Sequence, residues 1–370
     1  MAPMHVKLAL STLCENPERR TGLSTLFREF VGESRRLFPG VGWIVFAGPE
    51  EPWPDGDPGV EVCRDFPSND RVIARIFADH FLVAAAARRR GASALITVGF
   101  HPLLTAGLPV VMHVLAVAGP RRDRGARALY RKWALARGLR RSALVVTNSS
   151  WARSTLGAGK ARVLVSPEGL RHELFRPEGP SYGGTAGKYF LWASNFYPYK
   201  RVGLALAAYA GLPPRTRLDH PFVLVGGDWK GGRGLAETQA GRLGIQQNVR
   251  FLGWVDDDAL PGLYRGALAH VMSTSHETFG RSVLEAMACG CPNVVQDLQV
   301  LREVAGDSAL YVDFADTAAG TQALAAICAD PELRARLGAG GIARSKEFSF
   351  ERLARERVGA IAGILGEAIP

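Results

Sequence analysis

The first 150 residues alternate between short apolar runs and longer stretches in which apolar and polar residues mix. Short runs rich in branched apolar residues are typical of strands buried on both faces of a parallel sheet. Such runs predict strands at 6–10, 42–47, 94–98, 110–114 and 143–147. The stretch 71–90 is long enough for a helix between two of these strands. Strands that alternate with helices predict an α/β doubly wound domain.

The second half repeats this pattern without repeating the sequence. Its apolar runs predict strands at 189–193, 222–225, 249–252, 269–272, 293–295 and 309–311. A stretch rich in glycine and proline, residues 177–187, separates the halves and predicts a linker. We therefore expect an N-terminal domain over 1–176, the linker over 177–187, a C-terminal domain over 188–349 and a terminal helix within 350–370. Ligands of open parallel sheets bind beyond the carboxyl ends of the strands. With two such domains facing each other, we expect the site in the cleft between them.

Composition and charge narrow the class of protein. The chain has 370 residues, of which 47% are hydrophobic, enough to fill two cores and to exclude a disordered protein. Its formal net charge of +10 indicates an anionic partner, such as nucleotide phosphates, an anionic acceptor, a membrane surface or nucleic acid. The five cysteines show no metal or disulfide spacing, which favours a reducing compartment. No signal peptide or transmembrane helix is expected, so we predict a cytoplasmic protein.

Two carboxylates eight residues apart, Glu277 and Glu285, mark the most informative segment. Ser282 with Glu285 three residues later fits a capping box, which predicts that a helix begins at Ser282. A helix N-terminus presents free amides and partial positive charge, which suits a phosphate. A carboxylate in the preceding loop can accept hydrogen bonds from sugar hydroxyls. The segment favours a nucleotide-sugar site, with plain surface charge and a mere capping role for Glu285 as open alternatives.

Residues 277–292 also resemble the E-x7-E signature of family 4 glycosyltransferases, retaining enzymes of the GT-B fold. The matching features are the acidic-x-Phe-Gly start, the run Leu-Glu-Ala-Met-Ala-Cys-Gly and the following Cys-Pro. The resemblance implies two Rossmann-like domains, a nucleotide-diphosphate sugar donor and no catalytic metal. It implies that Glu277 binds the hydroxyls of the transferred sugar and that Glu285 binds the ribose. The diphosphate would then lie on the segment Phe279, Gly280, Arg281, Ser282 and Val283.

A second segment, 190–201, resembles the family's phosphate-binding stretch. The family usually carries an arginine there, followed five residues later by a lysine. Lys200 matches the lysine, whereas Asn195 stands where the arginine is usual. The missing cation could be supplied by Arg201, Arg281 or Lys230. A cation is needed because the leaving diphosphate gains charge as the glycosidic bond breaks.

Further site residues follow from the resemblance in the rest of the chain. His113 ends a predicted strand at a point where the family carries a histidine near the sugar, and Gly22 lies in the loop after the first strand. The base would lie near the second of two paired strands, at Gly253, Trp254 and Val255, although core packing is an equal interpretation of Trp254 and Val255. Asp256–Asp258 resembles a metal motif of another fold, but its position favours the N-cap of a helix. The last helix would return to pack on the N-terminal domain.

Residues 119–141 carry nine basic side chains against one acidic, interleaved with Leu129, Tyr130, Trp133 and Leu135. This pattern predicts a basic amphipathic helix. It could lie on an anionic membrane that carries a lipid-linked acceptor, or it could be a solvated helix face.

The resemblance, taken with these features, implies a retaining, metal-independent glycosyltransferase with no cofactor beyond its donor substrate. It would move a hexose from GDP-mannose or a UDP-sugar to a hydroxyl of a glycan, lipid-linked or small-molecule acceptor. The catalytic candidates are His113, Lys200 and Glu277. The alternatives are a GT-B-fold nucleotide-sugar epimerase, a phosphorylase, or a catalytically degenerate nucleotide-sugar-binding protein. No nucleic-acid partner is expected, because neither a zinc motif nor an aromatic stacking platform accompanies the charge.

Overall fold

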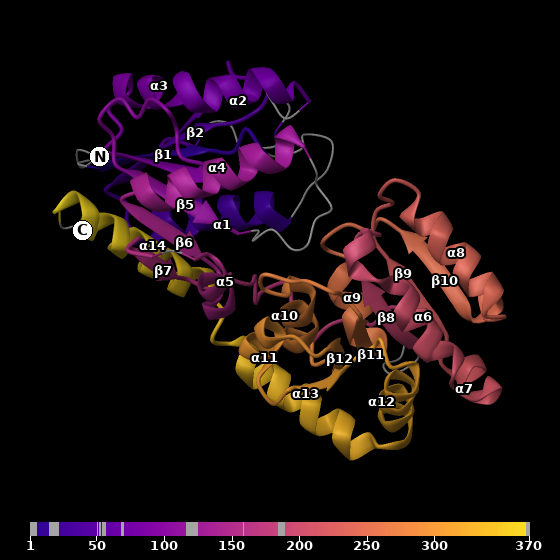
Figure 1. The fold of residues 1–370 in the computed structure, drawn as a ribbon. Coiled ribbons are helices and arrows are strands. Elements are labelled where there is room, and N and C mark those ends of the chain that lie inside the picture. Colours follow the sequence, from indigo (N-terminus) through magenta and orange to yellow (C-terminus); the bar gives the residue numbers. More distant parts are fainter. Residues whose placement is uncertain are drawn as a thin grey trace. The chain divides into compact units, whose positions relative to one another are not determined.

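The computed structural model describes residues 6–14, 22–49, 51, 53, 57–67, 70–115, 125–157, 159–183 and 189–367. The chain forms two compact units, Met1–Gly169 with Phe350–Pro370, and Leu170–Ser349. Each unit is a parallel sheet with helices on both faces (Figure 1). Residues 170–183, predicted in part as first domain and in part as linker, belong to the second unit, and the terminal helix belongs to the first.

The first unit contains a seven-stranded sheet in the order β3-β2-β1-β4-β5-β6-β7. Its strands are β1 (Val6–Ser11), β2 (Val41–Phe46), β3 (Val60–Cys63), β4 (Ala94–Val98), β5 (Val110–Val114), β6 (Leu144–Thr147) and β7 (Val163–Val165). Its helices are α1 (Gly22–Leu37), α2 (Val72–Phe81), α3 (Val83–Arg89), α4 (Ala126–Arg141), α5 (Ser150–Thr155) and α14 (Phe350–Leu365).

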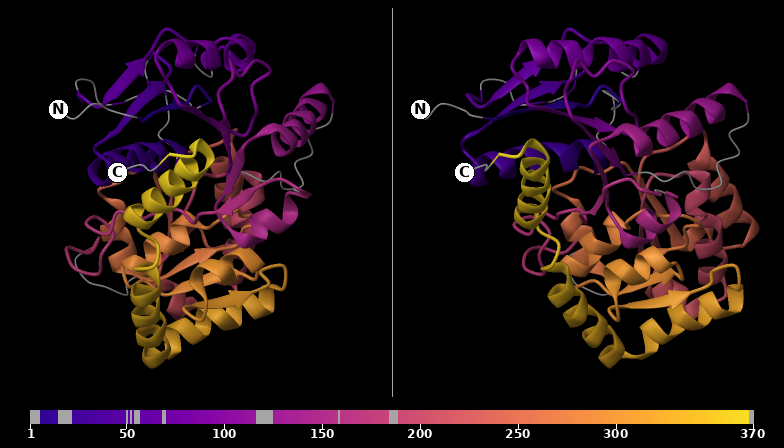
Figure 2. Two further views of the ribbon diagram at one scale, coloured as in Figure 1. Left: turned by 90° about the vertical axis from the view of Figure 1, so that its left-hand side faces the viewer. Right: turned by 60° about the vertical axis from the view of Figure 1, so that its left-hand side comes forward.

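Separate clusters of buried apolar side chains cover the two faces of this sheet. On one face α1 and α14 pack together, and Phe27, Phe30 and Leu353 are buried beneath them. Figure 2 shows α14, in yellow, beside the indigo α1. On the other face the alanine-rich helix α3 packs on the strands through Ala84 and Ala87. Small side chains let this helix approach the sheet closely.

The second unit contains a six-stranded sheet in the order β10-β9-β8-β11-β12-β13. Its strands are β8 (Tyr189–Ala193), β9 (Phe222–Val225), β10 (Val249–Gly253), β11 (Ala267–Met272), β12 (Asn293–Gln296) and β13 (Ala309–Val312). Its α-helices are α6 (Val202–Ala210), α7 (Pro214–Asp219), α8 (Gly232–Arg242), α9 (Leu260–Gly266), α10 (Arg281–Ala288), α11 (Gln299–Ala305), α12 (Thr317–Ala329) and α13 (Pro331–Ser345), with two 3-10 turns at Pro198–Lys200 and Gln246–Asn248.

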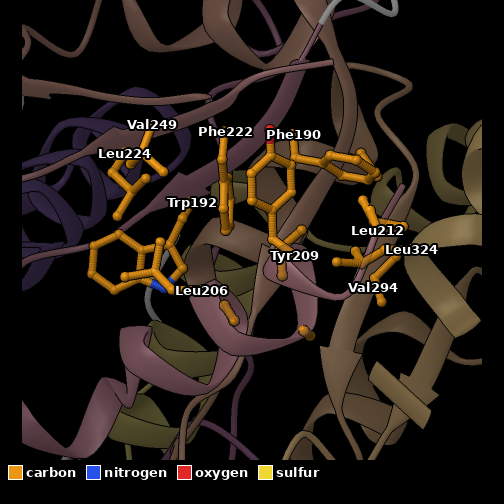
Figure 3. Close-up of a cluster of buried hydrophobic side chains, with 14 of the residues drawn as sticks. Phe190, Trp192, Leu206, Tyr209, Leu212, Phe222, Leu224, Val249, Val294 and Leu324 are labelled. Atoms are coloured by element: carbon orange, nitrogen blue, oxygen red, sulfur yellow. The ribbon is translucent and has the colours of Figure 1, made fainter. Parts of the chain in front are cut away.

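Aromatic side chains fill the core on one face of the second sheet. Phe190 and Phe222 project from β8 and β9 toward Tyr209 of α6, and Trp192 lies in the same core near Leu206 (Figure 3). Phe190 and Tyr209 meet edge to face with ring centroids 6.1 Å apart. Such pairs stabilise a core beyond the area they bury, so the strands that position the candidate site rest on a rigid layer.

The strands predicted from apolar runs are all present, and the fold prediction of two Rossmann-like units is confirmed. The predicted helix over 71–90 is broken at Leu82 into α2 and α3. Two strands, β3 and β7, were not predicted. Both lie at a sheet edge, where a strand needs fewer apolar residues, and β7 has only three residues. None of the described helices is both long and apolar enough to cross a membrane.

Candidate functional site

The order of strands in the second sheet identifies where a ligand would bind. The chain builds β9 and β10 on one side of β8, and β11 to β13 on the other. In open parallel sheets, ligands bind beyond the carboxyl ends of the strands at such a reversal point. The loops that leave β8 and β11 flank this point. They carry Lys200, in the 3-10 turn Pro198–Lys200, and Glu277.

Lys200 and Glu277 form an ion pair, in which Lys200 Nζ donates to Glu277 Oε1. Both side chains are only 13% exposed. Burial lowers the pKa of Lys200, but the Glu277 carboxylate, together with Tyr199 and Tyr197, outweighs burial and leaves this pKa raised overall. Lys200 therefore stays cationic at neutral pH. The structure brings together two of the three predicted catalytic residues, 77 positions apart in the sequence.

Hydrogen bonds between the two loops hold this pair in place. The Ser275 amide donates to the Tyr199 carbonyl at 2.8 Å, and Ser273 Oγ donates to the Arg201 carbonyl at 2.8 Å. The Thr274 side chain, fully buried, donates to the His276 carbonyl at 2.8 Å. The serines and threonine between β11 and Glu277 thus tie the loop to the end of the turn that carries Lys200.

Helix α10 begins at Arg281, one residue earlier than predicted. Gly280 is its N-cap, with φ 102° and ψ 51°, and no side chain caps this end in the structure described. The predicted capping box was wrong: Ser282 lies inside the first turn, and Glu285 begins the second. Gly280 adopts a left-handed conformation that favours glycine, and a Cβ there would lie 2.5 Å from Leu301 Cδ2. The backbone rather than a serine side chain therefore sets the helix start.

Glu285 is held by two side chains and is 8% exposed. Its Oε2 accepts a hydrogen bond from Tyr264 Oη at 3.0 Å, and its Oε1 accepts one from Arg281 Nε at 3.1 Å. Burial raises the pKa of Glu285, and Arg281 and Tyr264 partly oppose this. Arg281 thus contacts Glu285 across one helical turn, and its predicted role as a substitute cation for Asn195 stays a prediction.

Asn195 acts here as a loop clamp. Its Oδ1 accepts a hydrogen bond from the Gly227 amide at 2.8 Å, which joins the loop after β8 to the loop after β9. Trp254, 51% exposed, lies next to the same glycine at the end of β10, and Gly253 has φ 75°. Three neighbouring strand ends therefore converge where the resemblance places the donor.

The other predicted donor residues have different environments. The side chains of Phe279 and Val283 are buried in the core, so only their backbone groups are available to a ligand. Arg201 is exposed and left-handed, with φ 49°. Val255 packs against the core beside α9, in line with the packing alternative.

Three aromatic residues near Lys200 were not predicted as site residues from the sequence. Tyr197 stacks on Tyr199 with centroids 5.4 Å apart and lies 5.0 Å from the ring of Trp229. Lys200 Nζ is 5.5 Å from the centroid of Tyr199, a distance at which ring and cation attract. The signal was present in the sequence, since aromatic residues follow both β8 and β9 closely.

In the first unit, His113 lies on β5 and is fully buried. Its ring stacks on Phe27 at 5.2 Å, and neither ring nitrogen has a hydrogen-bond partner among the described residues. Burial, and then the charge of Arg357, hold the pKa of His113 well below its ordinary value, so the ring is neutral. Its contact with a sugar stays a prediction. Gly22 is the first residue of α1, and Arg19 and Arg20 beside it lie outside the described residues.

A polar cluster not predicted from the sequence lies at the ends of β6 and β7. Arg357 of α14 is fully buried and donates to Ser166 Oγ at 3.3 Å and to the Ser166 carbonyl at 3.2 Å. Asn148 Nδ2 donates to Glu168 Oε1 at 3.0 Å. Burial lowers the pKa of Arg357 to about 10, with Glu168 acting against the shift.

The aspartates at 256–258 do not cap a helix. Helix α9 begins at Leu260 with Ala259 as its N-cap and no side-chain cap, so the predicted N-cap cluster was wrong. Asp257 instead forms an ion pair with Arg171 at 3.3 Å. No group of three or more potential metal ligands occurs in the described part of the chain.

Comparison with known proteins finds similarity in the part of the chain that carries this site. A family model described as "Glycosyl transferases group 1" matches residues 184–344. The chain is 34% identical over 173 residues to the O-antigen chain mannosyltransferase B of Escherichia coli, covering 46% of this chain and 45% of that protein. It is 33% identical over 210 residues to a D-inositol 3-phosphate glycosyltransferase of Frankia alni, covering 52% and 51%. The chain thus spans about half the length of these curated relatives.

Solved structures share the fold along nearly the whole chain. Sucrose-phosphate synthase from Thermosynechococcus elongatus superposes with a TM-score of 0.83 at 19% identity, covering 98% of this chain and all of that one. HepE from Anabaena, solved in complex with UDP-glucose, superposes with a TM-score of 0.75 at 18% identity, covering 97% of this chain and all of that one. These likenesses show the GT-B fold. The region that the family model matches contains Lys200, Glu277 and Glu285, so the candidate site lies in the part of the chain that is similar to the glycosyl transferases group 1.

Proposed function

We propose that this protein is a retaining glycosyltransferase that moves a hexose from a nucleotide-diphosphate sugar to a hydroxyl of a glycan, lipid-linked or small-molecule acceptor. The observation that carries the proposal is the Lys200–Glu277 ion pair at the reversal point of the second sheet. The pair places a cation and a carboxylate side by side where the family match lies. A donor needs both, because its diphosphate is anionic and its sugar presents hydroxyl donors.

The roles follow from hydrogen-bonding capacity. An ammonium has three donors, and Glu277 occupies one of those on Lys200. The remaining donors can stabilise the diphosphate as it leaves. A carboxylate accepts more than one hydrogen bond, so Glu277 can hold Lys200 and sugar hydroxyls together. Amides at Gly280–Val283 would bind the diphosphate, Glu285 the ribose, and Gly253, Trp254 and Val255 the base.

Retention requires the acceptor to attack from the face that the diphosphate leaves. The bond from the anomeric carbon to the phosphate oxygen breaks, and a bond to the acceptor oxygen forms on the same face. The departing phosphate oxygen takes the proton of the acceptor hydroxyl, so no enzyme nucleophile and no metal are required. His113 would hydrogen-bond the transferred sugar.

Mannose is the hexose we favour. The name of the Escherichia coli relative is that of a mannosyltransferase, and Tyr199-Lys200-Arg201 resembles mannosyltransferase-like members of the family. GDP-mannose is therefore the first donor to test and UDP-glucose, the ligand of the HepE structure, the second. A cytoplasmic enzyme in contact with the inner face of the membrane would meet both.

The proposed function predicts the effect of Glu277→Gln. We expect turnover with GDP-mannose and a soluble glycan acceptor to fall about 100-fold or more, because sugar contacts strengthened in the transition state are lost. Affinity for the nucleoside diphosphate, measured by calorimetry, should stay nearly unchanged. The control Glu237→Gln removes another ion-paired carboxylate, which pairs with Arg233 on the exposed surface of α8. Equal turnover in the two variants would contradict the role of Glu277.

Arg281→Ala tests the compensation for Asn195. We expect donor affinity to fall about tenfold, because the diphosphate site then holds the buried Glu285 without its cation. Arg215→Ala, at a residue whose side chain is 82% exposed, is the matched control. An unchanged donor affinity in Arg281→Ala would remove Arg281 from the donor site.

Product analysis separates the alternatives. Transfer to an acceptor supports the proposal, an isomerised donor indicates an epimerase, and phosphate-dependent cleavage of a glycan indicates a phosphorylase. Binding of nucleotide sugar with neither transfer nor donor hydrolysis indicates a degenerate binding protein.

A further inference from the structure

The positive charge of this protein is concentrated in one stretch of the first unit. Residues 121–162 contain twelve arginines and lysines and one acidic residue, a local net charge of +11 compared with +10 for the whole chain. Within it, α4 carries six basic residues and no acidic one. Residues 116–124 lie outside the described part of the chain, so the surface is built here from α4 and its described neighbours.

Large apolar side chains are exposed beside this charge. On α4, Leu129 and Trp133 lie one turn apart and are 69% and 43% exposed. On α2, Ile73 and Phe77 lie one turn apart and are 86% and 55% exposed, and Leu104 is 57% exposed. We call these five residues the apolar patch.

Contacts around His80 bring together the three segments that carry the apolar patch. His80 Nε2 hydrogen-bonds Tyr130 Oη at 2.8 Å, and its ring lies 6.2 Å from that of Trp133, which joins α2 to α4. The Leu104 amide donates to the His80 carbonyl at 3.0 Å, which brings in the loop after β4. Three segments far apart in the sequence are therefore neighbours, and each carries exposed apolar side chains.

Basic side chains border the apolar patch on α4. Arg131, Lys132 and Arg140 are exposed. Lys132 and Arg140 also line a cavity of about 720 Å³ between α4 and the turn before β7, together with Lys160 and Arg162. No acidic side chain is among the described residues that line it. The cavity suits a phosphate group.

The basic residues beside the apolar patch indicate whether a protein or a membrane covers it. Exposed apolar patches mark protein or membrane contacts, and a protein interface is depleted of charge at its centre. Here apolar residues, a tryptophan and a row of cations share one helix, the pattern of helices that lie in a membrane interface. We propose that the apolar patch and the basic residues of α4 dock the first unit onto an anionic lipid bilayer. The apolar side chains enter the bilayer, and the cations bind lipid phosphates.

The docked position suits a lipid-linked acceptor. Helices α2 and α4 follow β3 and β5, so their first turns lie at the carboxyl edge of the first sheet, where ligands of such sheets bind. The docking does not depend on sugar transfer, whereas its use for an acceptor rests on the proposed function. The sequence predicted a contact through 119–141 alone, and the structure adds α2 and Leu104.

Vesicle co-sedimentation of the full chain tests the docking. We expect binding to vesicles of phosphatidylcholine with about one-third phosphatidylglycerol, little binding to phosphatidylcholine alone, and binding that weakens as salt rises. The triple variant Ile73→Ser, Phe77→Ser, Leu129→Ser should reduce partitioning at least about tenfold. The triple variant Arg131→Ala, Lys132→Ala, Arg140→Ala should reduce it about 100-fold.

Matched controls lie in the second unit. Leu218→Ser with Leu235→Ser changes two leucines that are 66% and 71% exposed, and Arg215→Ala with Arg242→Ala changes two exposed arginines. Both should bind vesicles like the wild type. All the substituted positions are exposed, so thermal melts should coincide, and transfer to a water-soluble acceptor should be unchanged.

Several results would overturn the docking. These are no binding to anionic vesicles, equal losses in the controls, binding to random DNA in place of vesicles, or a wild-type dimer that the apolar variant converts to a monomer. Vesicle binding without sugar transfer would support the docking and contradict only the proposed function.

Discussion

A buried histidine couples protonation to stability in the second unit. His270 on β11 is 1% exposed, and its Nδ1 hydrogen-bonds Asn293 Oδ1 at 2.8 Å. Burial lowers the pKa of His270 from 6.5 to about 4, against the raising effect of the Asn293 bond. The unfolded chain therefore takes up the proton first as pH falls. The stability from neutral His270 is fully present above pH 6.5 and is lost as pH falls toward about 4.

Urea unfolding of the wild type and His270→Gln measures this coupling. Between about pH 7.5 and about pH 5 the wild type should lose about 2 kcal/mol more than the variant. Other titrating groups, such as buried Asp79, are present in both proteins and cancel in the difference. If the free energy of unfolding depends on pH in the same way in the wild type and in His270→Gln, His270 has the same pKa in the folded and the unfolded chain, and the prediction is wrong.

Which residues belong to the candidate site could be predicted from the sequence, but the hydrogen-bond partners of these residues could not. Lys200 and Glu277 follow from spacing and family pattern. The bonds from Arg281 and Tyr264 to Glu285, and from Gly227 to Asn195, depend on where side chains point after folding. An asparagine that appeared to weaken phosphate binding is also a clamp between two loops, which spacing alone does not show.

At the scale of elements, Gly226 directly follows β9 and packs against the loop after β8, which leads to the candidate site. Its φ is 145°, and a Cβ there would overlap the Ser194 carbonyl oxygen. We expect Gly226→Ala to lower the free energy of unfolding by about 3 kcal/mol, because the backbone of the loop after β8 would have to move. The stabilisation by nucleoside diphosphate in a thermal-shift assay should fall with it.

Gly234→Ala is the control for this change. Gly234 lies in α8, and a Cβ there would meet nothing within 4 Å. This alanine should raise stability by about 0.5–1 kcal/mol through helix propensity. Equal effects of the two alanines would show that the Gly226 conformation is not required.

Which elements were predictable follows from how each is buried. Central strands are covered on both faces and leave continuous apolar runs, so they were found. The edge strand β3 has mostly half-buried and exposed residues and was missed. The start of α10 was misplaced because Ser282 fits a cap by spacing, whereas the left-handed Gly280 ends the preceding loop one residue earlier.

At the scale of the molecule, the chain returns to its first unit at its end. Helix α14 packs on α1, and it buries Phe350, Leu353, Val358 and Ile361 in the core of the first sheet. No apolar period distinguishes a helix that packs locally from one that packs on a distant unit. The helix itself could therefore be predicted from residues 350–370, whereas its return to the first unit was predicted only from the family resemblance.

Ending the chain after Ser349 tests this return. Losing four large buried side chains should cost the first unit about 6 kcal/mol or more. Hydrogen exchange should accelerate in β1 to β7 and stay slow in β8 to β13, whose cores use no residue of α14. Nucleotide binding at Lys200 should persist, because its supporting bonds lie within Leu170–Ser349. As a control, a chain ending at Gly366 keeps α14, and its amides should exchange like those of the wild type. Fast exchange in both units of the chain that ends at Ser349 would mean that the second unit needs the first in order to fold.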